Sequence, residues 1–192
     1  MVVFDNTALS LLLRPGARPP LDPATGQPVA VAQERLAALV QRLQRSRTVV
    51  LIPAPVLSEL LIRAGAAGPG LLDVIQKSSA FRVGAFDTRA ATELAQMTNA
   101  SLTTGRERRE AGEAPWNKIR FDRQIIAIAK VHGATMIYSD DKNLIAFANS
   151  RAFSAFASTT CRYRNLCDSH NCRYRLHQPT KCKRNQVEPV SE

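Results

Sequence analysis

The feature that most constrains the fold is an alternation of short apolar segments with longer segments of helical periodicity. The short segments are rich in β-branched, aliphatic and aromatic residues, as buried strands are. Strands that alternate with helices form a mostly parallel sheet covered on both faces, so the sequence predicts the α/β class. The predicted strands cover residues 2–4, 48–52, 81–86 and 134–138, and the predicted helices cover 29–47, 56–65, 71–79, 88–97, 119–132 and 142–150.

Acidic residues follow the strands of this predicted sheet. Asp5 comes directly after the first strand, and Asp140 and Asp141 come directly after the last. Glu59 lies in the first turns of the helix after the second strand, and Asp122 shares a face with apolar residues of the helix before the last strand. Because right-handed crossovers place the carboxyl ends of parallel strands along one edge, we expect these acids to converge there.

Converging carboxylates repel one another at neutral pH unless a cation lies between them. A charge on an apolar helix face, as at Asp122, is also costly unless it is paired or bound to a cation. Oxygen ligands suit Mg²⁺ or Mn²⁺, and such an ion could activate water for hydrolysis of a phosphodiester. The pattern therefore predicts a divalent-cation site.

Each acid taken alone has a simpler interpretation. A single Asp after a strand is more often a turn residue or a helix cap, and Asp140-Asp141 could form an Asx turn that caps the last helix. Glu59 could be a solvated helix residue, and Asp122 could pair with a neighbouring arginine. Only the joint placement of the acids favours the cation site.

Four blocks of the sequence carry a resemblance to a known family: VVFDNTAL, IPAPVLSELL, KIRFDRQIIAIAKVHGA and MIYSDDKNL. In order and spacing they resemble PIN-domain endoribonucleases, and among them the VapC-type toxins of toxin–antitoxin systems. The last two blocks are specific, whereas the first two would be weak signals alone. The resemblance covers about residues 1–150.

The resemblance implies a role for each acid. The fourth acid of the family lies two residues after a hydroxyl at a strand end; because Ser139 supplies that hydroxyl, Asp141 matches better than Asp140, which is the substitute. Thr7 and Ser139 match polar positions that line the site, and Asn6 could support a metal ligand or cap a turn. The implied metal ligands are Asp5, Asp122 and Asp141, and the remaining catalytic acids are Glu59 and Asp140.

The resemblance also implies an α/β/α sandwich around a sheet of four to five strands, usually in a homodimer. It implies cleavage of single-stranded or structured RNA that depends on Mg²⁺ or Mn²⁺, with a cognate antitoxin that buries the acidic cleft. Water is the nucleophile in such enzymes, so no protein nucleophile is needed. The one histidine before residue 170, His132, precedes a helix-ending glycine and is interpreted as a C-terminal cap.

The net charge of +10 favours polyanionic partners such as nucleic acid, although a solvated basic surface would explain it equally well. Phosphate contacts by basic side chains would give affinity without sequence information. The candidates for RNA binding are Arg106, Arg108 and Arg109 in a polar loop, and Arg120 and Arg123 beside Asp122.

The resemblance ends near residue 152, and residues 152–192 form a separate basic tail after a nuclease domain of residues 1–151. The tail holds all four cysteines but few large aliphatic residues, so disorder is the leading interpretation. Zinc binding is an alternative, although the cysteines lack C-x₂-C spacing. A change of reading frame is another; a missing last strand would then expose one sheet edge.

No apolar run is long enough to cross a membrane and no secretory signal is recognisable, so we expect a cytoplasmic protein. The leading functional hypothesis is an endoribonuclease toxin. Two alternatives remain at this stage: a binding protein that keeps the fold but has lost activity, and a PIN nuclease of RNA processing outside toxin–antitoxin systems.

Overall fold

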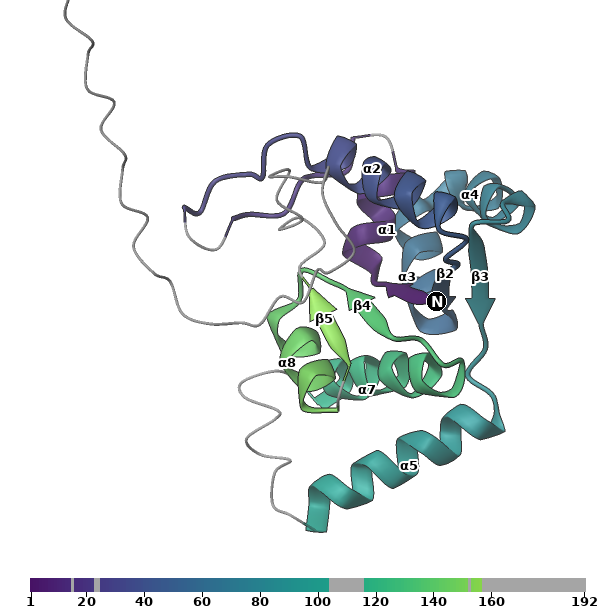
Figure 1. Ribbon diagram of the computed structural model, residues 1–192, viewed down its shortest axis with the longest axis vertical. Helices are drawn as coiled ribbons and strands as arrows, with labels where there is room; N and C mark the ends of the chain where they lie inside the picture. Colours follow the sequence, from purple (N-terminus) through teal and green to yellow (C-terminus); the bar gives the residue numbers. More distant parts are fainter. Residues whose placement is uncertain (15, 23–24, 104–115, 152, 157–192) are drawn as a thin grey trace, which may run out of the picture. The chain divides into compact units, whose positions relative to one another are not determined.

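The computed structural model describes residues 1–14, 16–22, 25–103, 116–151 and 153–156. Five strands form one sheet in the order β3-β2-β1-β4-β5, and every neighbouring pair is parallel. The α/β class and the parallel sheet expected from the sequence are confirmed (Figure 1). The strands are β1 (Val2–Phe4), β2 (Val50–Pro53), β3 (Phe81–Gly84), β4 (Met136–Tyr138) and β5 (Ser154–Phe156).

Helices connect the strands and cover the sheet. In Figure 1, α1, α2 and α4 lie on one side of the strands, and α5, α7 and α8 lie on the other. The α-helices are α1 (Asn6–Leu13), α2 (Ala32–Arg45), α3 (Ala54–Ala64), α4 (Gly68–Lys77), α5 (Thr88–Thr103), α7 (Trp116–Val131) and α8 (Lys142–Ser150), and a 3₁₀ turn spans Gly65–Ala67. None of the described helices is long and apolar enough to span a membrane.

The core lies on both faces of the central strands. All residues of β1 and β2 are buried, as expected for inner strands of a parallel sheet, which read as continuous apolar runs. Helix α7 is also buried over five consecutive residues, 125–129, because it packs against α5, α3 and β2. Arg123, which lies just before this run, is therefore buried as well.

Two elements differ from the sequence prediction. Helix α1 was not predicted; it starts directly after β1, where the Asp5 side chain caps it. Strand β5 lies inside the segment that we assigned to the tail, and it carries the described fold past residue 151. It pairs Ala155 with Ile137 of β4, so β4 is an inner strand rather than the exposed edge that a missing last strand would have left. Residues 157–192, with all four cysteines, lie outside the described residues.

The parallel sheet brings the ends of three strands together. Phe4 of β1 pairs with Tyr138 of β4, and Val3 pairs with Leu51 of β2. The residues that follow β1 and β4 therefore lie side by side at one edge, and the start of α3 lies beside them. This edge carries the predicted acids.

Candidate active site

Asp5 lies at the centre of the site and is the most buried of its acids, with 5% of its surface exposed. Its Oδ1 accepts a hydrogen bond of 2.9 Å from the Ala8 backbone amide, which caps α1. Its Oδ2 accepts a hydrogen bond from the Ser139 hydroxyl. Burial raises the pKa of Asp5 to about 7; these two hydrogen bonds oppose the rise, and the charges of Asp140 and Asp141 add to it.

Asp141 is linked to Asp5 through Ser139. The Asp141 backbone amide donates a 3.0 Å hydrogen bond to Ser139 Oγ, whose hydroxyl in turn donates to Asp5. The Asp141 carboxylate caps α8 by accepting from the Asn143 amide at 2.8 Å, and its other oxygen forms an ion pair with Lys118. Burial alone would raise the pKa of Asp141, but Lys118 and the α8 amides outweigh it and lower that pKa.

Asp122 enters the site from α7, one turn after Lys118. Burial is the main cause that raises the pKa of Asp122 to about 6; the charges of Asp141 and Glu59 add to the rise, and Lys118 opposes it. Because Asp122 responds to carboxylates on α3 and before α8, these acids share one electrostatic environment. Asp122, Asp141 and Glu59 all line one cleft.

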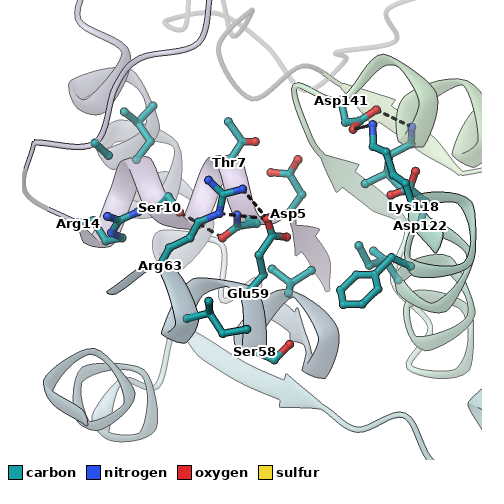
Figure 2. Close-up of a pocket in the computed structure, with 18 of the residues that line it drawn as sticks. Asp5, Thr7, Ser10, Arg14, Ser58, Glu59, Arg63, Lys118, Asp122 and Asp141 are labelled. Carbon is teal, nitrogen blue, oxygen red and sulfur yellow. Dashed lines mark hydrogen bonds and ion pairs between the residues drawn. The ribbon is translucent and has the colours of Figure 1, made fainter. Parts of the chain in front are cut away.

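Glu59 lies on α3 and is more exposed than Asp5 and Asp141, at 38% for its side chain. Its Oε1 accepts hydrogen bonds from Arg63 Nη2 at 2.8 Å and from Nε at 3.1 Å, one helical turn further along α3. Figure 2 shows this pair on one side of Asp5, with Lys118, Asp122 and Asp141 on the other. Glu59 thus carries an arginine partner that the sequence analysis did not assign to it.

A cleft of about 920 Å³ opens over these acids. Asn6 and Thr7, expected as site-lining residues, both line it, and Asn6 Oδ1 accepts from the Ser10 hydroxyl at 3.2 Å. Ser139 is fully buried beneath Asp5, so it supports the site rather than facing the cleft. Asp140 does not line the cleft, although its charge acts on Asp5. The charged side chains that line the cleft are Asp5, Glu59, Asp122, Asp141, Arg14, Arg18, Arg63 and Lys118.

The donor atoms at this site are carboxylate oxygens, the type of ligand that a hard divalent cation prefers. As the side chains lie, no three acidic, histidine or cysteine side chains of the described residues come together closely enough to hold an ion. Two of the carboxylates are instead paired with protein cations, Glu59 with Arg63 and Asp141 with Lys118. An ion bound by the Oδ2 atom of Asp141 would therefore compete with Lys118.

The basic residues of the cleft differ from those proposed from the sequence. Arg106, Arg108 and Arg109 lie outside the described residues. Arg120 is exposed but does not line the cleft. Arg123 is only 2% exposed, and its guanidinium lies over the Phe147 ring at 5.6 Å, so an RNA strand on the surface does not reach it.

Arg14, Arg18, Arg63 and Lys118 occupy the cleft instead. The sequence analysis missed them because two follow α1 in a stretch to which no helix or strand was assigned, and the other two lie one helical turn from the acids Glu59 and Asp122. The spacing of Arg63 four residues after Glu59 was a usable signal, since residues at that spacing are neighbours on a helix.

The sequence profile of the PIN domain matches residues 29–149 of this chain. The matched range contains Glu59, Asp122 and Asp141, whereas Asp5 precedes it. No curated protein sequence matches the chain.

Two solved structures are similar to this chain at low sequence identity. One is VapBC2 from Rickettsia felis bound to a DNA fragment from their promoter, with a TM-score of 0.52 and 12% identity over 82% of this chain and 98% of that chain. The other is VapC20 from Mycobacterium tuberculosis, a sarcin-ricin loop cleaving toxin, with a TM-score of 0.49 and 15% identity over 77% of this chain and 95% of that chain. At such identities the first likeness concerns the fold alone.

Proposed function

Because this chain belongs to the PIN domain family, a family of nucleases, we propose that it is a metal-dependent endoribonuclease that hydrolyses phosphodiester bonds of single-stranded or structured RNA. The observation that carries the proposal is that carboxylates from three separate parts of the chain, Asp5, Asp122 and Asp141, line one cleft. Burial raises the pKa of two of them, and each is affected by the charge of another acid. Such mutual repulsion at a sheet edge favours a bound cation.

We propose Asp5, Asp122 and Asp141 as the residues that would hold Mg²⁺ or Mn²⁺, with Glu59 beside them. The ion would neutralise the carboxylates and activate a water molecule for attack on phosphorus. The protein's own contribution is to fix the carboxylates: the Ala8 amide and the Ser139 hydroxyl hold the two oxygens of Asp5. Such buried supports keep a ligand in one orientation.

The basic residues of the cleft would bind the substrate backbone. Neither Arg14 nor Arg18 forms an ion pair with another described residue, and both line the cleft beside Asp5. Their guanidinium groups are therefore free to bind phosphate oxygens, which suit the planar arginine fork. Arg63 and Lys118 are already paired with acids and would contact phosphate only by leaving Glu59 and Asp141.

Within the PIN domain family, we propose that the chain is a VapC-type toxin. The proposal rests on the four sequence blocks, each of which carries an acid that lines the cleft. The likeness of fold to a chain of VapBC2 agrees with it. A cognate antitoxin would then cover the cleft, the chain would form a homodimer, and it would act in the cytoplasm, where its RNA substrate lies.

The direct test is RNA cleavage by the wild type, Asp5→Asn and Asp122→Asn with Mg²⁺, with Mn²⁺ or with EDTA. Asparagine keeps the size of each side chain and, at position 5, an oxygen that can still cap α1. Asp73→Asn is the matched control, because Asp73 lies on α4 in an exposed pair with Lys77 and outside the cleft. Cleavage that persists in EDTA, or in either cleft variant, would refute the metal-carboxylate mechanism.

The toxin assignment has a separate test. Expression of the wild type should arrest bacterial growth, and expression of Asp122→Asn at the same level should not. A small reading frame directly upstream should encode a protein that relieves the arrest and inhibits cleavage. RNA cleavage without growth arrest would instead indicate a PIN nuclease of RNA processing, and folded protein without cleavage would indicate a binding protein that has lost activity.

A further inference from the structure

Two exposed apolar side chains face the candidate active site. Seven large apolar side chains are exposed among the described residues, and of these only Ile62 and Phe121 line the cleft. Ile62 on α3 is 79% exposed, and Phe121 on α7 is 40% exposed. Exposed apolar groups gathered at a cleft indicate a ligand with apolar surface of its own.

Their positions tie both side chains to the reacting groups. Phe121 directly precedes Asp122, and Ile62 lies one helical turn after Glu59, on the neighbouring helix. The cleft wall beneath them is also apolar, with Val56 from α3 and Ile125 from α7 buried in it. One part of the cleft therefore offers apolar surface directly beside the carboxylates.

Another part of the cleft offers positive charge. Arg14 and Arg18 line it from the end of α1 and the loop that follows, and neither is paired with an acid of the described residues. A ligand that contacts both parts of the cleft would carry negative groups and apolar groups close together. A single-stranded nucleic acid has this chemistry, because its phosphates alternate with bases whose faces are exposed. A duplex lacks it, since its bases are stacked and paired inside.

We propose that Phe121 and Ile62 form a subsite for an unpaired nucleobase next to the scissile phosphate. The Phe121 ring stacks on the base face, and Ile62 covers the base from α3. The subsite selects substrates with an unpaired base at the cleavage position, and because any base has a stacking face, it discriminates pairing rather than sequence. This inference rests on the proposed nuclease function and adds the two residues, Phe121 and Ile62, that would contact an unpaired base.

A protein occupant of the same surface is the competing interpretation. An antitoxin segment or a second copy of this chain could also cover Ile62 and Phe121. Arg14 and Arg18 favour nucleic acid, since they pair with no acid of the described residues and provide two phosphate-binding groups in the same cleft. The two interpretations differ in what a Phe121 substitution changes: RNA affinity in one, and association with protein in the other.

The test compares Phe121→Ala, Phe121→Trp and Phe86→Ala for binding to a fluorescein-labelled single-stranded RNA in EDTA, followed by fluorescence anisotropy. Phe86 is the matched control, because it is 38% exposed but does not line the cleft. We expect Phe121→Ala to weaken binding about five- to tenfold, the lower part of the range for loss of one base–aromatic stack. Phe121→Trp should bind at least as tightly as the wild type, and Phe86→Ala should be unchanged.

A second RNA that lacks bases at its central positions isolates stacking from charge. The wild type should bind this abasic RNA more weakly than the intact strand, and Phe121→Ala should bind both equally. Ile62→Ala should also weaken binding of the intact RNA, but by less than Phe121→Ala. Val74→Ala should leave binding unchanged, because Val74 is exposed on α4 outside the cleft. In cleavage assays, Phe121→Ala should raise KM for single-stranded RNA more than it lowers kcat.

Several results would overturn the inference. One is that Phe121→Ala weakens binding of intact and abasic RNA equally. Another is that Phe121→Trp binds RNA as weakly as Phe121→Ala although its melting temperature is unchanged. A third is that Phe121→Ala changes only sedimentation or antitoxin binding. If the wild type cleaves RNA and Phe121→Ala has the same KM, the base subsite is refuted but the proposed nuclease function is not. If the wild type neither binds nor cleaves RNA, the proposed function fails and the subsite fails with it.

Discussion

Asp5 makes the strongest quantitative prediction, because its burial sets the pH dependence of stability. In the unfolded chain its carboxyl titrates near the ordinary value of 3.8, and in the folded chain burial raises its pKa to about 7. Between these values the unfolded state holds fewer protons than the folded state, so stability falls as pH rises. Each pKa unit corresponds to about 1.4 kcal/mol, which gives a destabilisation on the order of 4 kcal/mol above pH 7 and almost none below pH 4.

Asp5→Asn should remove this destabilisation. The amide is neutral at every pH, and its oxygen can still accept the hydrogen bond from the Ala8 amide. We expect the free energy of unfolding at pH 8 to rise by about 2–4 kcal/mol relative to the wild type, because the buried charge is gone. At pH 4 the two proteins should differ by less than about 1 kcal/mol.

The assay is urea unfolding of both proteins at pH 4 and pH 8 in EDTA, followed by far-UV circular dichroism. Asp73→Asn is the control; its exposed pair with Lys77 should contribute under about 1 kcal/mol at either pH. A stability difference for Asp5→Asn that is the same at pH 4 and pH 8 would refute the argument. So would a variant that is less stable than the wild type at pH 8.

Three further predictions concern the cations of the cleft and the packing behind it. Lys118→Met should tighten Mn²⁺ binding several-fold in isothermal titration calorimetry, since the ion no longer competes with the ammonium; unchanged affinity would contradict this. Replacing both Arg14 and Arg18 by Ala should weaken binding to single-stranded RNA and reduce the magnitude of the slope of log affinity against log salt by about 1.4, because each arginine neutralises one phosphate. Gly84→Ala should lower the free energy of unfolding by about 1–3 kcal/mol, because its Cβ would lie 2.8 Å from an isoleucine methyl group of α7. Gly70→Ala on α4, where a Cβ meets nothing within 4 Å, should be neutral or slightly stabilising.

The sheet could be predicted from the sequence because its inner strands are buried on both faces. Val2–Phe4 and the segment around Leu51 are continuous apolar runs, the pattern typical of inner strands of a parallel sheet. Strand β5 could not be found, since its three residues, Ser154–Phe156, carry no alternation or β-branched enrichment and are held by pairing with β4. Helix α1 is short and follows β1 without a turn, so only its cap by Asp5 marks where it begins.

The acids of the candidate site could be picked out from the sequence because each directly follows a strand, lies in the helix after a strand, or shares a helix face with apolar residues. Their partners could not, since an ion pair depends on where two elements meet: Lys118 on α7 reaches Asp141 only because α8 begins beside it. For Arg123, the sequence indicated a surface position, whereas the side chain is buried. A basic residue beside Asp122 suggests contact with RNA. However, Arg123 lies on α7 next to its buried residues 125–129 and is itself buried, with its guanidinium over the Phe147 ring.

The cleft thus contains two kinds of carboxylate, a distinction that spacing alone does not make. Asp141 and Glu59 have protein cations as partners, and Lys118 lowers the pKa of Asp141 even though Asp141 is partly buried. Asp5 and Asp122 lie where burial raises the pKa, to about 7 and about 6, and Lys118 only partly offsets this at Asp122. A divalent ion would therefore gain most of its binding energy from Asp5 and Asp122, because neither carboxylate forms an ion pair with a protein cation among the described residues. It would lose part of that gain if it displaced Lys118 from Asp141. If the proposed cation binds, it would relieve the destabilisation caused by burying these two carboxylates, and it would thereby stabilise the folded chain.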